Sequence, residues 1–447
     1  MGIRKYFYVN KFLAVLLLPS AFLFLPCHAR DLSFERAIEM IMAESHDLKK
    51  ADANLKKAQA SLDAANANRW FKIEGNATYM NIVNVRKPFS SEGVDLPPEL
   101  GGLIAQMGGG SQNISFPDNI FMVGATITQP IYTFGKIGNA VDSVRSAIKM
   151  SESGRELARR EVRYAAAQLY WTAKMTDGLV VIAEKSLNDA AVAQKKLTAV
   201  GRASRANLVK IEADVAAKEI NLSDARFNRD AAHRMLKIMA GIYVGEEMNL
   251  TTDFPSSFAV LNAGDIDTPE WDILNEQVKM NEALASSKRA GHYPTLATMA
   301  SYNYVAMHEN YELWHGSRTQ NAYWGLALTV PIFDGGLSRA NATIAAQDAI
   351  AARQDLDKSK KIKSEEYNTA IHRYDHLRGN LAALNNARDL AEKAYGYSRD
   401  RFAAGQTSAV ELSDVSAALA QMDIAVLNAK YNLLMAGEQV KKLTAGN

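Results

Sequence analysis

Hydrophobic and polar residues alternate in four short runs of this chain, which are arranged as two pairs. Because successive side chains of a β-strand point to opposite faces, this period of two predicts four strands, each with one apolar and one polar face. In the first run the polar positions are Lys72, Glu74, Asn76 and Thr78. The apolar positions, run by run, are Phe71, Ile73, Gly75, Ala77 and Tyr79; Phe121, Val123, Ala125 and Ile127; Leu296, Ala300, Tyr302 and Tyr304; and Trp324, Leu326, Leu328 and Val330.

Helical patterns fill most of the remaining sequence, and two of the predicted helices are very long. All 11 prolines lie at or before Pro331, and none falls within 131–254 or 332–447. Proline costs about 3 kcal/mol inside a helix, so long helices can persist in such gaps. Segments 136–200 and 337–404 are rich in good helix formers, and each would extend ~100 Å as one helix. Such lengths are typical of a tube or a bundle.

Each long segment ends in a similar turn, at Gly201 in the first case and at Gly405 in the second. A glycine supplies the left-handed residue that closes a helix, and the serine that follows can cap the next one. At the second turn, Ser408 and Glu411 have the spacing of a capping box. The turns therefore predict two antiparallel helical hairpins. Their return helices are expected near 205–240 and 408–444.

One short phrase occurs twice, each time between the second strand of a pair and a long helix. The copies are Gln129-Pro130-Ile131-Tyr132-Thr133-Phe134-Gly135 and Val330-Pro331-Ile332-Phe333-Asp334-Gly335-Gly336. Their prolines and glycines, Pro130, Gly135, Pro331, Gly335 and Gly336, are predicted to bend strand into helix. This repetition indicates an internal duplication. The predicted order is a first repeat at 30–241 with an upstream helix at 32–69, a linker at 242–268, and a second repeat at 269–447 with an upstream helix at 269–291.

The N-terminal segment 1–29 has the features of a secretory signal peptide. Three cations precede the apolar run 12–25, and Cys27 and Ala29 occupy the −3 and −1 positions of a cleavage site. Two alternatives remain open. One is an uncleaved anchor, although the run is short and contains Pro19, and the other is lipidation of Cys27, although the residues before it lack the usual pattern. Cleavage leaves 48 Lys and Arg against 49 Asp and Glu, a nearly neutral chain.

Strands of roughly ten residues have the length that crosses an outer membrane when they are tilted. The first two strands are separated by the long segment 84–119, which contains four prolines, and a shorter polar link joins the last two. If these two connecting segments lie at one end of the strands, all the helices lie at the other end. Four strands cannot close a barrel, and an open edge in lipid leaves backbone groups unpaired at a high cost. Three copies would supply twelve strands and gather the helices into a second tube.

No catalytic motif accompanies this organisation: HExxH, GxxxxGK[ST], GxSxG and CxxC are all absent. Aromatic content of 8% and charged content of 22% favour neither disorder nor nucleic-acid binding. His372 and His376 have the i, i+4 spacing of a metal pair, but without a third ligand a solvated helix face is the preferred interpretation. The sequence predicts no enzyme, no cofactor and no metal site.

With an export signal, two strand–Pro-Ile–aromatic–Gly joints, long helices and Gly-Ser turns in order, the chain resembles the TolC family of outer-membrane efflux proteins. The resemblance covers essentially the whole exported chain. It implies an α+β membrane protein: a homotrimer whose twelve-stranded β-barrel, with four strands per protomer, continues as a periplasmic α-helical barrel. It also implies a belt around the middle, for which 242–268 is a candidate. The implied surroundings are outer-membrane lipid, a periplasmic adaptor (membrane fusion) protein, and an inner-membrane pump or ABC exporter.

The resemblance assigns roles to the helical tips, which in this family form the periplasmic entrance and meet the adaptor. Glu411 and Asp414 would occupy the positions whose carboxylates ring the narrowest point, favouring cations. Their i, i+3 spacing lets both face one way, although Glu411 would also be acceptable as a capping residue alone. In one member of this family an Arg and an Asp help to hold the entrance shut, and the corresponding positions here are Thr407 and Asn207, so that charged latch is absent. The other predicted contact positions are Gly201, Arg202, Phe402, Gly405 and Ser408.

The leading hypothesis is therefore a passive conduit, the outer-membrane exit duct of a tripartite efflux pump or a type I secretion system. An adaptor would open it at its helical tips. The alternative is a periplasmic coiled-coil adaptor or scaffold, which would also use long hairpins but would not need four alternating strands. An exported enzyme lacks any catalytic constellation. Drugs, metal ions, polysaccharides and polypeptides all leave through this architecture, so the resemblance does not select a cargo.

Overall fold

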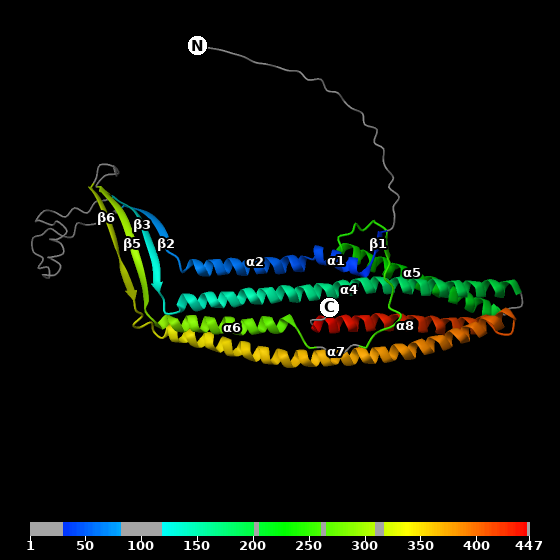
Figure 1. Ribbon diagram of the computed structural model, residues 1–447. Helices are drawn as coiled ribbons and strands as arrows, with labels where there is room; N and C mark the ends of the chain where they lie inside the picture. The colour runs from blue at the N-terminus through cyan, green and yellow to red at the C-terminus, as the bar shows by residue number, and fades with distance from the viewer. Residues whose placement is uncertain (1–29, 82–118, 201–204, 261–264, 309–316, 445–447) are drawn as a thin grey trace, which may run out of the picture.

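The computed structural model describes residues 30–81, 119–200, 205–260, 265–308 and 317–444. The molecule is elongated, with a β-sheet at one end and long helices that run from it to two hairpin turns at the other (Figure 1). The predicted signal segment and the predicted long loop between the first two strands lie outside the described residues. None of the described helices combines the length and the hydrophobicity needed to cross a membrane.

The sheet is antiparallel, and its strand order follows the chain: β2 (Lys72–Asn81), β3 (Asn119–Tyr132), β5 (Thr295–His308) and β6 (Ser317–Thr329). Its register confirms the predicted faces. Ile73, Ile127, Ala300 and Trp324 lie opposite one another in a row across the four strands, and the other predicted apolar positions within the strands share their face. The predicted positions Phe71 and Val330 lie one residue beyond the ends of β2 and β6. The opposite face carries most of the polar side chains of the sheet, together with some apolar ones such as Met122 and Val305. There, the hydroxyl groups of Thr126 and Ser301 lie 3.0 Å apart. Strands β2 and β6 are the open edges.

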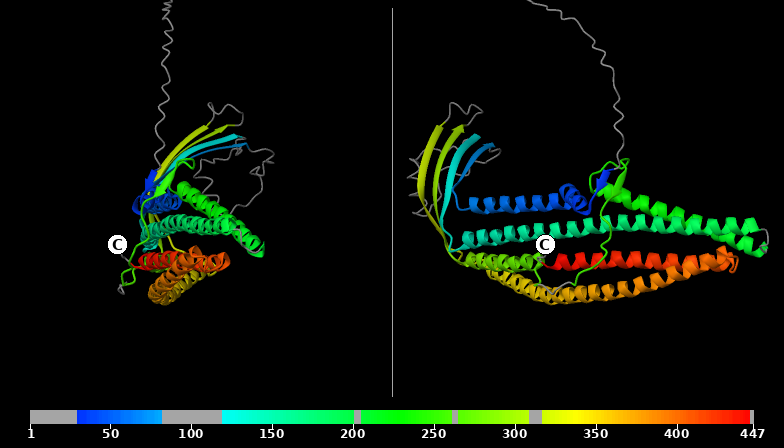
Figure 2. Two further views of the ribbon diagram at one scale, coloured as in Figure 1. Left: turned by 90° about the vertical axis from the view of Figure 1, so that its right-hand side faces the viewer. Right: turned by 45° about the vertical axis from the view of Figure 1, so that its right-hand side comes forward.

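The two long helices match their predicted bounds to within one residue. Helix α4 pairs with α5, and α7 pairs with α8, so that two antiparallel hairpins lie side by side through a contact between α4 and α8 (Figure 2). Helices α2 and α6 lie along α4 between the middle of the molecule and the sheet. The helices are α1 (Phe34–Glu44), α2 (His46–Ala67), α4 (Lys136–Val200), α5 (Arg205–Met239), α6 (Pro269–Arg289), α7 (Leu337–Ala403) and α8 (Ala409–Leu443).

The prediction of one upstream helix over 32–69 is wrong. Ser45 interrupts it between α1 and α2 with non-helical backbone angles (φ −53°, ψ 121°). The Ser45 hydroxyl accepts a hydrogen bond from the Leu48 N–H at 3.3 Å, so this serine ends one helix and caps the next. The second upstream helix ends at Arg289 and continues as a short 3-10 turn, η1 (Ala290–His292).

The main core lies midway along the molecule, where β1 (Arg30–Leu32) pairs in parallel with β4 (Met248–Leu250). Tyr170 of α4 is fully buried there, and its hydroxyl donates to the Leu32 carbonyl at 3.3 Å and accepts from the Thr252 N–H at 3.0 Å. Trp171 packs on Phe254 with ring centroids 5.2 Å apart. These contacts attach the start of the 242–268 segment to the middle of α4.

Candidate functional site

The first strand–helix joint is a bend held by aromatic packing. Strand β3 loses its register with β5 between Pro130 and Tyr132, which is a bulge at a residue that has no N–H to donate. Phe134 and Gly135 then take positive φ values of 50° and 86°. The Phe134 ring lies 4.6 Å from that of Tyr132 and 5.8 Å from that of Tyr293. The aromatic rings of this joint therefore pack on one another, while Ile131 and Tyr132 stay 53% and 56% exposed.

The second joint has the same backbone form but little packing. Gly335 and Gly336 have φ values of 66° and 88°. The Asp334 carboxylate accepts hydrogen bonds from the N–H groups of Gly336 at 3.0 Å and Ser338 at 2.8 Å, which caps α7. Hydrogen bonds from the Ser338 hydroxyl and backbone hold the pKa of Asp334 below its usual value. The side chains before this cap are largely uncovered, because Ile332 is 94% exposed and Phe333 is 89% exposed.

The tip between α7 and α8 is closed as predicted by Gly405, whose φ is 72°. The N–H of Gln406 donates to the Arg401 carbonyl at 2.8 Å, and that of Gly405 donates to the Phe402 carbonyl at 3.0 Å, which is a Schellman closure. Ser408 caps α8 by accepting from the Glu411 N–H at 3.1 Å. The Glu411 carboxylate accepts from the Thr407 hydroxyl rather than completing a capping box through the Ser408 backbone.

Glu411 and Asp414 both lie on the first turns of α8, and both are exposed. Leu412, between them in sequence, is buried at 6% exposure in a small apolar cluster at the tips. The two carboxylates therefore face away from the packing of their own chain, as their spacing predicted. The arrangement can present two negative charges per chain at one level of the helical end.

The same cluster joins the two hairpin tips. It consists of Ala193 of α4, Ile211 of α5, and Ala409 and Leu412 of α8, and Phe402 packs against it. The Lys196 ammonium lies over the Phe402 ring, 6.0 Å from the ring centroid. Asn207 is half-buried in the first turn of α5. The predicted contact residues Gly201 and Arg202 lie outside the described residues.

Sequence reasoning did not find a set of polar contacts between the hairpins near the tips, which we call the polar seam. The Ser413 hydroxyl of α8 donates to the Asp214 carboxylate of α5 at 2.5 Å. Tyr395 of α7 forms a hydrogen bond with Asp189 of α4, and burial together with that bond raises the pKa of Tyr395 to about 12. No motif marks these four residues, since each pair comes from two helices that are distant in sequence.

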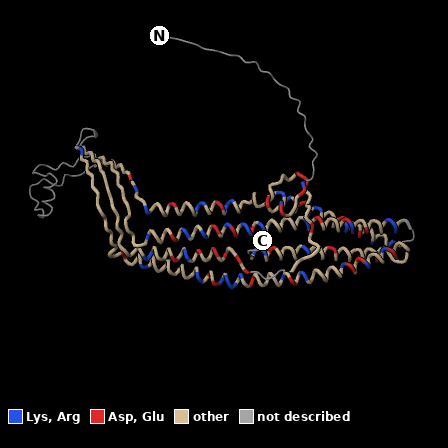
Figure 3. The backbone as a smooth tube through the Cα atoms, in the orientation of Figure 1, with Lys and Arg blue, Asp and Glu red and all other residues tan. Residues whose placement is uncertain are grey.

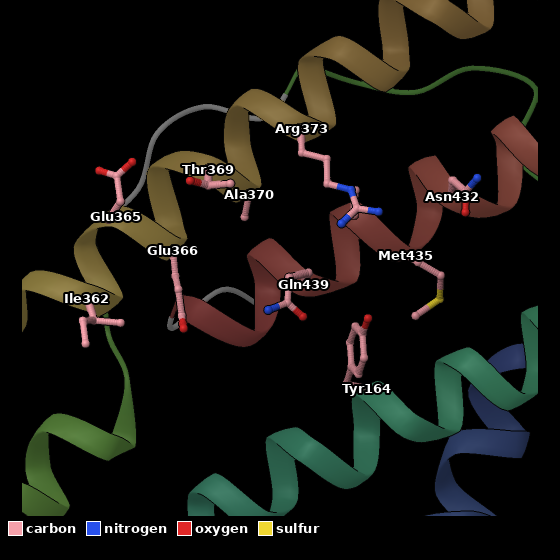
Figure 4. A pocket seen from close by; sticks show the side chains of 11 residues that line it. Tyr164, Ile362, Glu365, Glu366, Thr369, Ala370, Arg373, Asn432, Met435 and Gln439 are labelled. Atoms are coloured by element: carbon pink, nitrogen blue, oxygen red, sulfur yellow. The ribbon is translucent and has the colours of Figure 1, made fainter. Parts of the chain in front are cut away.

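A cavity of about 600 Å³ lies farther from the tips, between α4, α7 and α8 (Figure 4). Tyr164, Arg373 and Gln439 supply polar groups to it, and Met435 and Ala436 form part of its apolar wall. Among the described residues, no three His, Cys, Asp or Glu side chains are grouped to hold a metal ion. His376, one of the two spaced histidines, bonds to the Asn380 amide at 3.0 Å.

The fold is shared with outer-membrane channels of known structure. The Campylobacter jejuni outer membrane channel CmeC is 18% identical and superimposes with a TM-score of 0.72, covering 92% of this chain and 85% of that chain. Vibrio cholerae VceC, an outer membrane protein, is 16% identical with a TM-score of 0.73, covering 92% and 96%. The open state of the Neisseria gonorrhoeae outer membrane channel MtrE is 15% identical with a TM-score of 0.75, covering 92% and 89%. No curated protein matches the chain by sequence.

The sequence itself carries a family signature beyond this likeness of fold. Residues 37–241 and 275–446 match the family described as outer membrane efflux protein, and these ranges contain both joints and both hairpins. The match confirms the resemblance indicated by the joints, the long helices and the turns. The chain is a member of the outer membrane efflux protein family.

Proposed function

We propose that the protein is the exit duct of a tripartite efflux pump or a type I secretion system, a passive homotrimeric channel in the outer membrane. The observation that carries this proposal is the four-stranded sheet, which has one apolar face and two open edges. A sheet of this kind is satisfied in lipid only if its edges pair with other copies. Three copies would close a twelve-stranded barrel, and the helices would continue it as a tube through the periplasm.

Exposed apolar side chains on the outer helices support assembly with further copies. In one chain, α5 and α7 are the two outer members of the row α5, α4, α8, α7. On α5 the exposed residues Val209, Ile220, Phe227 and Ile238 recur at intervals of 11, 7 and 11, which places them on one face of the helix. On α7, Leu390 and Tyr397 are 67% and 72% exposed. Packing α5 of one copy on α7 of the next would bury both surfaces.

The tips would form the periplasmic entrance and the contact with an adaptor protein of an inner-membrane pump or ABC exporter. Glu411 and Asp414 of three copies would place six carboxylates around the opening, which favours cations. The neighbouring positions Gly201, Arg202, Asn207, Phe402, Gly405, Thr407 and Ser408 would meet the adaptor. Opening would separate the hairpin tips, and the energy for transport would come from the inner-membrane partner.

Single-channel conductance in planar bilayers tests this proposal, comparing the detergent-purified protein with the Glu411→Ala/Asp414→Ala variant. Discrete cation-selective openings that lose selectivity in the variant are expected. Unchanged selectivity would refute the acidic ring but keep the conduit, and it would leave Glu411 with its capping role. If a folded protein never inserts and leaves cells without detergent, the conduit proposal fails, and a periplasmic scaffold becomes the better interpretation.

A further inference from the structure

Positive charge is concentrated where the sheet meets the helices. Four connecting segments, 64–73, 130–139, 286–295 and 330–340, together contain six Lys and Arg but one acidic residue, Asp334. Over the whole chain the two classes are balanced, at 51 and 49. Blue backbone segments at the sheet ends of the helices in Figure 3 show the same concentration.

Five of these six cations form a set that we call the basic collar: Arg69, Lys136, Lys288, Arg289 and Arg339. All five side chains are exposed. None of them is in an ion pair with an acidic residue in the described part of the chain. The sixth cation, Lys72, lies on the polar face of β2 and is not part of the set. The collar therefore carries positive charge that the described residues do not neutralise.

Helix stability explains only part of the collar. Arg69, Lys288 and Arg289 lie at or just beyond the C-terminal ends of α2 and α6, where a cation suits the helix dipole. Lys136 and Arg339 are in the first turns of α4 and α7, where the dipole disfavours a cation. The Asp334 carboxylate caps α7 and offsets this effect there, whereas the first turn of α4 contains no acidic residue. Lys136 therefore works against its own helix, and one carboxylate at the second joint does not balance the five cations, so an anion outside the chain is the more direct explanation.

Exposed aromatic residues lie on the sheet side of the collar. Trp70 directly follows Arg69 and is 67% exposed, Tyr132 precedes Lys136 and is 56% exposed, and Phe333 precedes Arg339 and is 89% exposed. Aromatic rings of this kind collect at the membrane interface, and long cationic side chains reach from there to the headgroups.

Hydrogen bonds hold these segments at one level of the molecule. The Gln129 side-chain amide donates to the Arg69 carbonyl at 2.8 Å, and the Ser287 hydroxyl donates to the Lys136 carbonyl at 2.7 Å. The order along the molecule is therefore an apolar sheet face, then aromatic rings, then unpaired cations. That order matches the sequence of hydrocarbon, interface and phosphate in a phospholipid leaflet.

We propose that the basic collar binds the headgroups of anionic phospholipids in the membrane leaflet on the helical side of the sheet. This inference rests on the proposed function, because it requires the sheet to lie in a membrane. Charge complementarity selects this occupant, since a neutral headgroup would leave five cations uncompensated. The collar would fix how deeply the sheet sits and would enrich anionic lipid around the protein.

Quenching of tryptophan fluorescence by brominated lipids tests the proposal in vesicles. Trp70 lies beside the collar, and Trp324, which is 82% exposed, lies on the apolar sheet face. Brominated phosphatidylglycerol and brominated phosphatidylcholine would be compared as quenchers in mixed vesicles. We expect the apparent affinity for phosphatidylglycerol, measured as quenching, to exceed that for phosphatidylcholine by roughly five- to tenfold. This ratio should decrease in 0.5 M salt.

Two variants test whether the selectivity for anionic lipid comes from the basic collar. The collar variant changes all five cations to Gln, and a matched control changes five exposed lysines of α2 and α7 that lie away from the sheet: Lys56, Lys57, Lys358, Lys360 and Lys361. The ratio of the apparent affinity for phosphatidylglycerol to that for phosphatidylcholine should approach one in the collar variant and stay at the wild-type value in the control. Wild-type selectivity in a collar variant with normal helical content would overturn the inference. If neither brominated lipid quenches a variant in which Trp324 is kept and the other four of the five tryptophans are changed to Phe, the protein is not inserted, and the proposed function fails instead.

Discussion

The two strand–helix joints solve one geometric problem with different side chains. Aligned by their shared phrase, Thr133 corresponds to Asp334, Phe134 to Gly335, and Gly135 to Gly336. Both joints place two consecutive residues at positive φ, and both cap the following helix from the residue before that pair. The first joint packs aromatic rings against one another at its bend, whereas the second leaves Ile332 and Phe333 almost fully exposed.

The difference shows which joint has its aromatic contacts within a single chain. Phe134 tolerates a left-handed conformation that usually suits glycine, and its contacts with Tyr132 and Tyr293 offset that strain. Gly335 and Gly336 need no such compensation, and Phe333 has no comparable ring contact among the described residues. The first joint is therefore stabilised locally, and the second is suited to a neighbouring copy or lipid.

Charging the second joint should have the largest effect. Burying each of the native side chains, Ile332 and Phe333, would stabilise the assembly by about 2 kcal/mol. The Ile332→Asp/Phe333→Asp variant loses that stabilisation and places two charges where apolar contact is needed. We expect loss of trimers on size-exclusion chromatography with light scattering, with helical circular dichroism retained. Normal trimers that still insert into bilayers would show that these side chains meet neither a neighbouring copy nor lipid.

Removing one ring from each joint should sharpen the contrast. Phe134→Ala deletes two intrachain ring contacts of a side chain that is 41% exposed, so we expect a loss of about 1 to 2 kcal/mol in the free energy of unfolding. Phe333→Ala should instead lower stability in a way that depends on protein concentration, because it weakens assembly. Thermal unfolding at several concentrations distinguishes the two. An equal concentration dependence in both variants would contradict the comparison.

Replacing the glycines of the two joints by alanine should change the stability of the protein by smaller amounts. Alanine at Gly336 meets nothing within 4 Å, so it should cost only the left-handed backbone strain of about 1 kcal/mol. Alanine at Gly135 carries the same strain and also approaches the Asn139 side-chain nitrogen at 3.2 Å. The unfolding midpoint in urea should therefore fall slightly more for Gly135→Ala. The reverse order would mean that Asn139 moves aside at no cost while Gly336 is constrained by a neighbouring copy.

The smallest effect should be a pH dependence confined to the second joint. The pKa of Asp334 is lowered in the folded chain, so its cap stabilises α7 above the ordinary carboxyl pKa near 4 and is lost as pH falls through the folded value. Thr133 caps the first joint without a titrating group. Amide exchange at Ser338 should accelerate in acid more than exchange at Ile137, and Asp334→Asn should abolish the difference. Parallel acceleration in both would assign the effect to general unfolding.

The periodic parts of this fold could be predicted because their signals are local. Alternation placed Ile73, Ile127 and Trp324 on one sheet face, and the joints and glycine turns within the proline-free gaps set the bounds of the long helices to within a residue. The break at Ser45 was missed because a capping serine inside a helical pattern looks like an ordinary polar position. The polar seam was also missed, since Asp189 and Tyr395 meet through tertiary packing, which carries no sequence period.

The left-handed pairs at the joints have a mechanical consequence at the far end of the molecule. Helix α4 contains 65 residues, so at 1.5 Å per residue it is a lever of ~100 Å whose pivot is the bend at Phe134 and Gly135. A tilt of only ~3° at that pivot displaces the hairpin tip by ~5 Å, about one helical turn. The stiffness of a few residues beside the sheet therefore contributes to how precisely the position of the distant hairpin tip can be held.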